Sequence, residues 1–346
     1  MHLYLDNGYL DMKSIIHCGM PFILLVGARG TGKTYGAAVD VIEERIPFIW
    51  MRRLQTATDE INKVDFSIYK TINRKLGWNV YPFKAGKYSA VYRDGEYNDK
   101  GKLVATGEPY GITTSLSTVA HLRGIDVQEA KILIYDEFIP EEHERPMRGE
   151  GAAYLNAYET INRNREFDGE PPLISLCMAN SNDLGNPLMV EMGLVEAAIK
   201  LQKSKREYMF LEDRGIALIM PKYSPISQRK AGTALYKMTA NQKFAGMALR
   251  NTFAIEGEAQ IGSRDLREYR PVLTVGVLTV YEHKSKEQYY VSHHHAGTAE
   301  TYTDERIELL RFKDHNMWLW GAHMDRLVLF ETYSAMRLLE EYFSTT

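Results

Sequence analysis

Short runs of mostly apolar residues recur along the first part of the chain, and glycine or polar residues follow each of them. The runs cover residues 22–26, 47–51, 132–135 and 172–178. Such runs predict strands that are buried on both faces, as in a parallel sheet between two layers of helices. Helical patterns follow the runs at residues 35–44, 58–76, 152–165 and 187–206. The alternation predicts an α/β fold with a central, mostly parallel sheet.

Two regions depart from this alternation. Residues 78–118 combine tyrosines with glycines and with turn-forming pairs such as Asp94-Gly95, which predicts short antiparallel strands inserted into the α/β unit. From about residue 230 the pattern is that of an α+β unit. Its predicted strands cover 251–256, 271–281 and 288–292, and its predicted helices begin at Thr303 and cover 324–343.

The stretch 207–230 lies between the two patterns and is broken by Pro221 and Pro225. We interpret it as the connection between two domains, because proline interrupts both helices and central strands. The predicted organisation is a first domain over 1–206, a linker region over 207–230 and a second, smaller domain over 231–346.

Composition limits the class of protein. The chain has 346 residues, of which 45% are hydrophobic and 25% are charged, and its net charge is −3. No apolar run approaches the roughly 20 residues of a membrane span, and the two cysteines, Cys18 and Cys177, imply neither a disulfide framework nor a zinc site. We therefore expect an intracellular protein. The net charge gives no overall sign of nucleic-acid binding, so any such binding must come from local basic surfaces.

The first apolar run leads directly into a phosphate-binding pattern, G-x-x-x-x-G-K-[ST], which the chain matches at every fixed position. The loop consists of Gly27, Ala28, Arg29, Gly30, Thr31, Gly32, Lys33 and Thr34. Its glycines let backbone N–H groups surround a phosphate chain, and the following helix adds its positive N-terminal end. Lys33 is expected to contact the β- and γ-phosphates, and the hydroxyl of Thr34 to bind Mg²⁺.

The third run ends in Asp136-Glu137, the pattern of a Walker B strand. In this position Asp136 organises the ligands of Mg²⁺, and Glu137 can polarise the water that attacks the γ-phosphate. The last run ends at Ala179-Asn180. A polar side chain at the tip of the strand beside Walker B can hydrogen-bond the γ-phosphate or this water, and Asn180 is placed for that role.

Two pairs of arginines are further candidates. Arg52 and Arg53 follow the second run, where open α/β sheets bind ligands. They either touch nucleotide phosphates or a neighbouring subunit, or form a solvated strand end. Arg163 and Arg165 end a predicted helix, where an arginine can complete the active site of a neighbouring subunit. From their spacing alone, a favourable interaction with the helix dipole is the preferred interpretation.

Taken together, these motifs resemble the DNA-packaging ATPase, or encapsidation protein, of phi29-type tailed bacteriophages. This is a terminase-like motor of the ASCE class of P-loop NTPases, which have an extra strand and a catalytic glutamate. The matching segments are GARGTGKT (27–34), WMRR (50–53), YDEF (135–138), RNRE (163–166) and CMAN (177–180). The resemblance covers the first predicted domain in its motifs, and the second only in length and general layout.

The resemblance implies that ATP and Mg²⁺ are the cofactors. Lys33 and Thr34 hold phosphate and metal, Asp136 is the metal carboxylate and Glu137 the catalytic base. Arg163 becomes the finger that reaches the next subunit. One departure concerns Gln55, which stands where the family can carry a basic residue with a role between subunits.

The resemblance also implies partners. Members of the family form a homopentameric ring, attached through a packaging RNA to the portal of a procapsid, and drive double-stranded DNA inward. The expected location is the host cytoplasm, with transient attachment to the procapsid. Four basic residues around the inserted strands either line a path for the DNA or are ordinary exposed charges; they are Lys84, Lys87, His121 and Arg123.

For the second domain the resemblance implies an α+β, RNase H-like fold that has lost its nuclease chemistry. The sequence agrees, because a two-metal nuclease needs carboxylates on its central strand and residues 272–281 contain none. Asp265 and Glu268 only precede that strand. Two alternatives remain open at this point, a terminase-like motor with an active C-terminal nuclease and a P-loop switch that binds nucleotide without hydrolysing it. Glu137 disfavours the switch.

Overall fold

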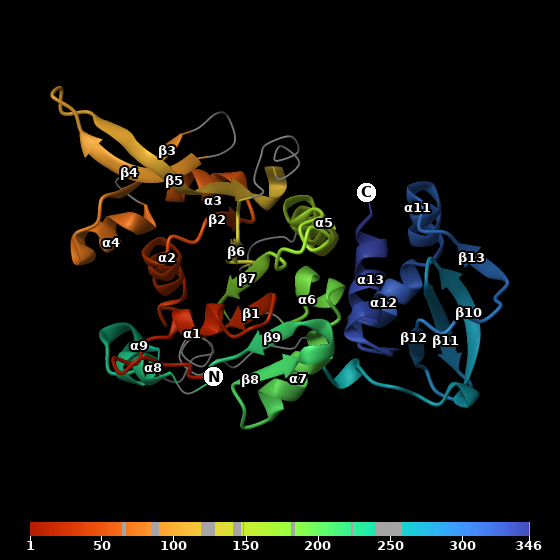
Figure 1. Ribbon diagram of the computed structural model, residues 1–346. Coiled ribbons are helices and arrows are strands. Elements are labelled where there is room, and N and C mark those ends of the chain that lie inside the picture. The colour runs from red at the N-terminus through yellow and green to blue at the C-terminus, as the bar shows by residue number, and fades with distance from the viewer. Residues whose placement is uncertain are drawn as a thin grey trace. The chain divides into compact units, whose positions relative to one another are not determined.

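The computed structural model describes residues 1–63, 67–84, 90–118, 129–140, 147, 149–180, 184–222, 224–239 and 258–345. The chain forms two compact units, which we describe separately (Figure 1). The first unit consists of Met1–Leu188 and Glu196–Ala254, and the second of Met189–Val195 and Ile255–Thr346. Lys87, His121, Arg123 and the strand predicted over 251–256 lie outside the described residues.

The first unit contains a nine-stranded sheet. Its strands are β1 (Phe22–Val26), β2 (Phe48–Arg52), β3 (Val80–Lys84), β4 (Ala90–Tyr97), β5 (Leu103–Ser115), β6 (Ile132–Asp136), β7 (Ile174–Ala179), β8 (Tyr208–Leu211) and β9 (Ile216–Ile219). Its helices are α1 (Met12–Ile16), α2 (Lys33–Glu43), α3 (Gln55–Ile61), α4 (Ile68–Leu76), α5 (Glu150–Asn162), α7 (Val195–Lys203), α8 (Pro225–Lys230) and α9 (Ala234–Met238). A short 3₁₀ helix, η2 (Glu212–Arg214), joins β8 to β9.

The strands follow the order β3-β4-β5-β2-β6-β7-β1-β9-β8. The six strands from β5 to β9 in this order are parallel to one another, whereas β3, β4 and β8 are antiparallel to their neighbours. Strand β7 therefore lies between the strand that leads into the phosphate loop and the strand that ends in Asp136. The predicted α/β fold with a mostly parallel sheet and an extra strand at this place is confirmed.

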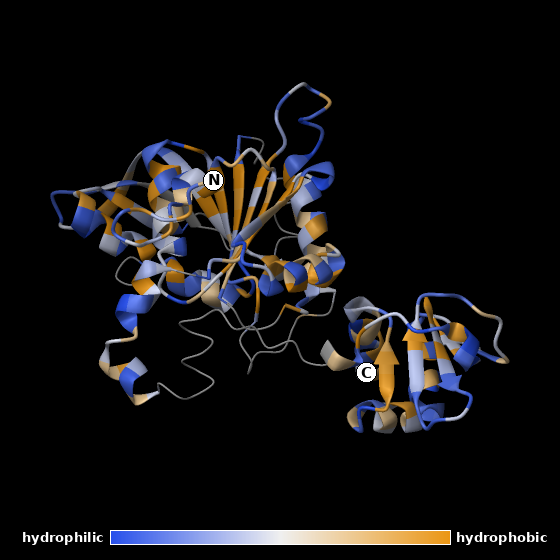
Figure 2. Cartoon of the chain, turned by 90° about the horizontal axis from the view of Figure 1, so that it is seen from below, coloured by the Kyte–Doolittle hydropathy of each residue, from blue (hydrophilic) through white to orange (hydrophobic). Residues whose placement is uncertain are grey.

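The central strands are mostly apolar because helices cover both faces of the sheet. Figure 2 shows these strands as hydrophobic along their length. On one face, Ile23 and Trp50 belong to the same buried cluster as Ile15 of α1 and Val41 of α2. On the other face, the ring of Tyr135 stacks on Tyr154 of α5 with centroids 4.9 Å apart. Successive residues of each strand thus pack against different helices, which explains the unbroken apolar runs.

The antiparallel strands predicted within 78–118 are present, but they extend the main sheet. Strands β3 and β4 form an antiparallel pair, and the first part of the long strand β5 continues this meander. The last part of β5, from Gly111 to Ser115, pairs in parallel with β2. One strand of 13 residues thus belongs to both patterns, because its last part pairs with β2 on one edge while β4 still pairs with Gly111–Thr113 on the other.

Two predicted helices are broken in the structure. The helix expected over 58–76 is the pair α3 and α4. The helix expected over 187–206 is the pair α6 (Pro187–Glu191) and α7. Between α6 and α7, Gly193 has a φ of 57°, a left-handed conformation that ends a helix.

The interpretation of 207–230 as a linker was wrong, because most of this stretch belongs to the first unit. Strand β9 pairs in parallel with β1, and β8 forms an antiparallel hairpin with β9. The two prolines that suggested a connection both follow β9. Pro221 comes shortly after the strand ends, and Pro225 is the first residue of α8. The whole of 207–230 falls within the first unit.

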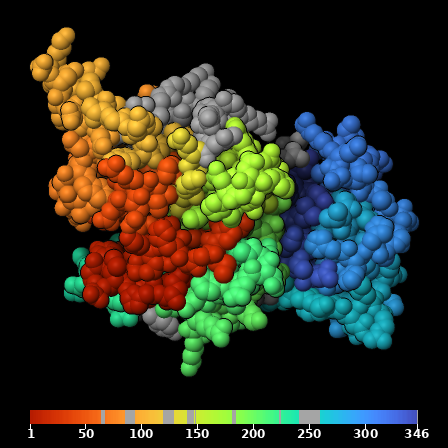
Figure 3. Space-filling view, viewed as in Figure 1, coloured from red at the N-terminus to blue at the C-terminus, as the bar shows by residue number. Residues whose placement is uncertain are grey.

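The N-terminal residues lie beside this returning segment. An ideal Cβ on Gly8 would stand 2.9 Å from Cβ of Pro225, so the two backbones are in close contact at the start of α8. Figure 3 shows the N-terminal segment in red, with the blue-green segment of α8 and α9 at its edge. The N–H of Leu10 also donates to the carbonyl of Thr31 at 3.0 Å. The phosphate loop is thus flanked by residues from both ends of the first unit.

The second unit has a five-stranded mixed sheet with the order β13-β10-β11-β12-β14. Its strands are β10 (Tyr269–Val275), β11 (Leu278–His283), β12 (Tyr289–Ser292), β13 (Glu300–Tyr302) and β14 (Val328–Phe330). Its helices are α11 (Arg306–His315), α12 (Met317–Met324) and α13 (Tyr333–Ser344), with 3₁₀ turns η3 (Glu258–Gln260) and η4 (Leu266–Glu268). The smaller α+β unit agrees with the predicted fold class. No helix among the described residues combines the length and the apolar composition needed to cross a membrane.

Two predictions for this unit need correction. The strand expected over 271–281 is a hairpin of β10 and β11, whose turn contains Gly276 with a φ of 53°. The helix expected over 324–343 contains β14 before α13 begins. In both cases a short apolar stretch is shared between two elements, which periodicity alone does not resolve.

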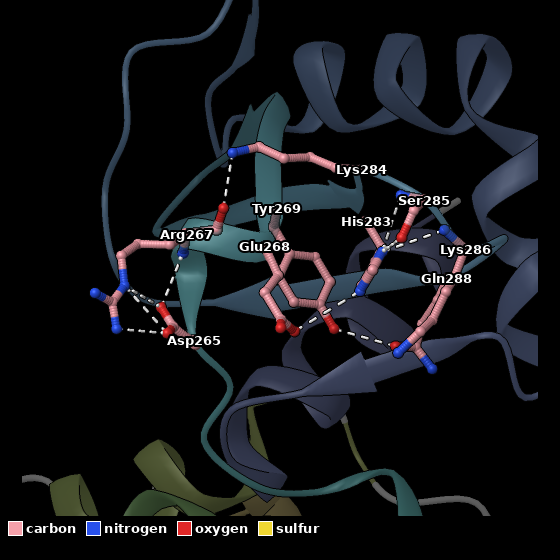
Figure 4. A network of polar contacts seen from close by, with 9 residues as sticks. All are labelled: Asp265, Arg267, Glu268, Tyr269, His283, Lys284, Ser285, Lys286 and Gln288. Atoms are coloured by element: carbon pink, nitrogen blue, oxygen red, sulfur yellow. Dashed lines mark hydrogen bonds and ion pairs between the residues drawn. The ribbon is translucent and has the colours of Figure 1, made fainter.

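A polar network surrounds the start of β10 and the turn between β11 and β12 (Figure 4). The carboxylate of Asp265 pairs with the guanidinium of Arg267 at 2.7 Å. Glu268 faces Nε2 of His283 at 3.8 Å, and Nδ1 of that ring accepts the N–H groups of Ser285 and of Lys286. The two carboxylates that precede β10 in the sequence therefore interact with neighbouring side chains of the same unit.

Candidate functional site

The phosphate loop connects the carboxyl end of β1 to the first residue of α2. Gly30 and Gly32 have φ values of 68° and 94°, a conformation that side chains with a Cβ adopt only with strain. These two glycines let the backbone curl over the end of the sheet before Lys33 starts the helix. The resulting loop at a helix N-terminus is the geometry that binds phosphate groups.

Lys33 is buried within its own loop. Its ammonium donates to the carbonyls of Gly27 at 2.8 Å and Ala28 at 2.9 Å, and to Oδ1 of Asn180 at 3.3 Å. Burial lowers the pKa of Lys33 to about 8, although the carboxylates of Asp136 and Glu137 act in the opposite direction. The ammonium therefore lies in a place where an anion would stabilise its charge.

Thr34 and Asp136 face each other across the loop. The hydroxyl of Thr34 lies 3.3 Å from both carboxylate oxygens of Asp136, which is 2% exposed. Burial raises the pKa of this carboxyl, and the guanidinium of Arg52 opposes the rise. These two oxygen donors fit Mg²⁺, which is commonly bound through one or two protein oxygens, with phosphate and water completing its ligands.

Glu137 differs from Asp136 although the two residues are adjacent. Its backbone has a φ of 59°, in the left-handed region, and its side chain is 57% exposed. A non-glycine residue held in this region is strained, and such strain occurs often at functional sites. The carboxylate of Glu137 therefore follows directly after the buried Asp136 but is open to water.

Arg52 joins the two carboxylates. Its guanidinium pairs with Asp136 at 3.0 Å and also pairs with Glu137. The sequence suggested contact with phosphates or a neighbour, or else a solvated strand end. The structure instead shows a buried arginine that holds the Walker B carboxylates together. No local pattern indicates this contact, because β2 and β6 become neighbours only in the sheet.

Arg53 has a different partner, Glu150, which no pattern in the sequence indicates. It forms two hydrogen bonds with Glu150, from Nε at 2.6 Å and from Nη2 at 3.0 Å. Glu150 also accepts from the hydroxyl of Tyr135 at 3.1 Å and from the N–H of Met147 at 3.0 Å. Both charged residues are at most 5% exposed. The expectation that Arg53 forms part of the phosphate site or a solvated strand end is therefore corrected; it anchors α5 to the sheet.

The remaining residues predicted from the sequence differ in how far they are exposed to solvent. Asn180 directly follows β7, next to the Walker B strand, and accepts from Lys33. Arg163 caps the end of α5 with a φ of 47° and is exposed. Arg165 is buried, and Gln55 bonds Ser115 and Asp59 within the first unit. Of the two arginines, Arg163 alone presents its side chain at the surface.

Sequence reasoning missed one basic residue, Lys230 at the end of α8. Its ammonium donates to the loop carbonyls of Arg29 at 3.1 Å and Gly30 at 3.0 Å. The ring of Tyr9 also lies at the loop, 3.0 Å from where a Cβ on Gly32 would stand. No signal in the sequence connects residue 230 to residue 30, because the two residues meet only through the pairing of β9 with β1.

Comparison with known proteins identifies the relatives of the chain. The family model described as podovirus DNA encapsidation protein (Gp16) matches residues 8–303. No curated protein matches the chain. A solved structure of the phi-28 gp11 DNA packaging motor is similar with a TM-score of 0.65 and 16% identity, over 98% of this chain and 97% of that one. The bacteriophage phi-29 viral genome packaging motor assembly is similar with a TM-score of 0.61 and 18% identity, over 99% of each chain.

At such low identities the two structures indicate a shared fold over nearly the whole length of each chain. The family match is independent of that likeness and covers most of the residues, including every motif of the site described above. The chain therefore belongs to the family of podovirus DNA encapsidation proteins.

Proposed function

We propose that the protein is an ATPase whose hydrolysis of ATP drives double-stranded DNA into a phage procapsid. The observation that carries this proposal is the convergence of Lys33, Thr34, Asp136, Glu137 and Asn180 at the carboxyl ends of three neighbouring strands. Hydrolysis of a phosphoanhydride needs a loop that binds phosphate, oxygen ligands for a metal and a carboxylate that accepts a proton from water. These residues supply all three.

In this proposal each side chain has one task. The loop from Gly27 to Thr34 binds the phosphate chain, and the buried ammonium of Lys33 neutralises its charge. Thr34 and Asp136 hold Mg²⁺, which supplies charge stabilisation at the phosphate oxygens. Glu137 accepts a proton from the attacking water at its carboxylate, and Asn180 orients the water or the terminal phosphate. Arg52 keeps the carboxylates of Asp136 and Glu137 side by side.

The proposed partners follow from the family. Double-stranded DNA is the substrate that is moved. The protein forms a ring, in this proposal a homopentamer, in the host cytoplasm. The ring is attached to the portal of the procapsid through a packaging RNA. The second unit, an RNase H-like domain in this proposal, grips nucleic acid or the portal without cutting DNA. DNA contacts should be mostly to phosphates, so DNA affinity should fall steeply as salt concentration rises.

Arg163 is proposed as the residue that completes the site of the next subunit, because it is exposed whereas Arg165 is buried. Arg163→Ala should abolish most ATP turnover and leave ATP binding intact. Removal of an arginine finger costs on the order of a thousandfold in turnover. A mixture of Arg163→Ala and Glu137→Gln subunits should be more active than either variant alone, since each variant lacks a different half of a shared site. The measurement is phosphate release at a series of mixing ratios.

Arg45→Ala is the matched control for this experiment. Arg45 is also exposed and also has a positive φ, of 52°, after the end of a helix. Its loss should change neither turnover nor complementation. Mixtures that never exceed the two separate variants would count against a site shared between subunits.

The experiment that tests the proposed function is steady-state ATP hydrolysis by the full chain at low salt, with and without long linear duplex DNA. Stimulation by the duplex that disappears in Lys33→Ala would support a DNA-coupled motor. Hydrolysis that DNA does not stimulate should be repeated with procapsids carrying their portal and RNA. Absence of hydrolysis under every condition would refute the ATPase and favour a nucleotide-binding switch.

A further inference from the structure

Lys230 is a second lysine at the phosphate loop, and it comes from a distant part of the chain. It is the last residue of α8, 200 residues after Gly30, whose carbonyl it bonds. An ideal Cβ on Gly30 would lie only 1.8 Å from Nζ of Lys230, so the ammonium stands directly on the tip of the loop. Glycine at position 30 leaves the space that this ammonium occupies.

The hydrogen-bond acceptors of the Lys230 ammonium are neutral. Both hydrogen bonds go to backbone carbonyls, of Arg29 and of Gly30. Lys33, by contrast, is balanced by the carboxylates of Asp136 and Glu137. Burial lowers the pKa of Lys230, and the charge of Lys230 also lowers the pKa of Lys33. Two cations thus lie at one loop, and the second would be stabilised by an anion.

We propose that Lys230 is a phosphate-binding residue of the nucleotide site, which moves its ammonium from the carbonyls of Arg29 and Gly30 to phosphate oxygens when a nucleoside triphosphate binds. The proposal rests on nucleotide binding at the phosphate loop, as inferred above. A lysine side chain has a flexible stem with rotatable donors, so this transfer needs no change in the path of α8. This transfer would make α8 part of the nucleotide-binding site. Binding of nucleotide would then change the contacts of the segment that follows β9.

The competing explanation is that Lys230 only pins the loop. A pin needs a hydrogen-bond donor, whereas a phosphate ligand needs a positive charge. Lys230→Gln separates the two, because glutamine can donate to the same carbonyls but carries no charge. Lys230→Arg keeps the charge, and Lys230→Ala removes both. Arg229→Ala is the matched control, since it removes a positive charge from the neighbouring, exposed position of the same helix.

The test is equilibrium binding of a fluorescent ATP analogue to the full chain with Mg²⁺ at low salt, with thermal melting to confirm that each variant is folded. Removing a charged hydrogen bond to phosphate is worth roughly a tenfold loss of affinity or more. We expect that loss in both Lys230→Ala and Lys230→Gln. Lys230→Arg should stay close to the wild type, and Arg229→Ala should equal it.

Two results would overturn the proposal while leaving the proposed function intact. Wild-type affinity in Lys230→Gln together with a loss in Lys230→Ala would identify a pin. Unchanged affinity in all three Lys230 variants would remove any role in binding. If the wild-type chain itself failed to bind the analogue, the proposed function would fail and this inference with it, so the two failures are distinguishable.

Discussion

Glu137→Gln is expected to lower ATP turnover by about a thousandfold while ATP still binds, within the range of general-base catalysis. The amide keeps the size of the carboxylate but cannot accept a proton from the attacking water. The side chain is 57% exposed, so the substitution should leave the fold intact. The loop from Gly27 to Thr34 and the carboxylate of Asp136 are unchanged in this variant, which is why binding should survive.

Two assays check this prediction on the same preparation, phosphate release for turnover and a fluorescent ATP analogue for binding. Glu170→Gln is the control, because Glu170 is a glutamate of similar exposure in the same unit whose partner is Lys131. Turnover within tenfold of the wild type in Glu137→Gln would assign the base to another residue. Loss of binding as well would mean that the ion pair with Arg52 maintains the shape of the site.

Arg53→Met should destabilise the fold by about 3–5 kcal/mol, which is the usual effect of breaking a buried ion pair by removing one partner. The substitution leaves the carboxylate of Glu150 buried, with the hydroxyl of Tyr135 and the N–H of Met147 as its remaining donors. The loss should appear as a lower urea midpoint of the full chain. Glu150→Gln should also destabilise, because it removes the negative charge that faces the buried guanidinium of Arg53 at 2.6 Å.

The contrast is with an exposed pair on the same unit. Lys131 and Glu170 are 3.3 Å apart and about half exposed, so Lys131→Met should change stability by less than about 1 kcal/mol. If Arg53→Met were as mild as Lys131→Met, the buried pair would not anchor α5 to the sheet. If Arg53→Met left stability unchanged but reduced nucleotide affinity, the expectation from the sequence that Arg53 contacts phosphate would be restored.

The parts of the site that sequence patterns predict are those in which one short segment contains both the structure and the chemistry. The apolar run, the glycines and Lys33-Thr34 are contiguous, so a local pattern is enough to locate a phosphate loop. The same holds for the run that ends in Asp136-Glu137. Buried parallel strands also have a local signature, because both of their faces need apolar side chains. The α/β class and the central sheet therefore followed from the sequence.

The sequence alone determined the class of the fold, and it predicted a phosphate loop over residues 27–34 and a pair of catalytic carboxylates at Asp136 and Glu137. Tertiary structure decided which side chains meet those carboxylates and that loop. Arg52 and Arg53 are neighbours in sequence, yet β2 directs one to Asp136 and the other to Glu150. Lys230 reaches Gly30 because β9 pairs with β1 inside the sheet and returns the chain to the site. Strand pairing between distant segments creates these contacts, and such pairing leaves no periodicity in either segment.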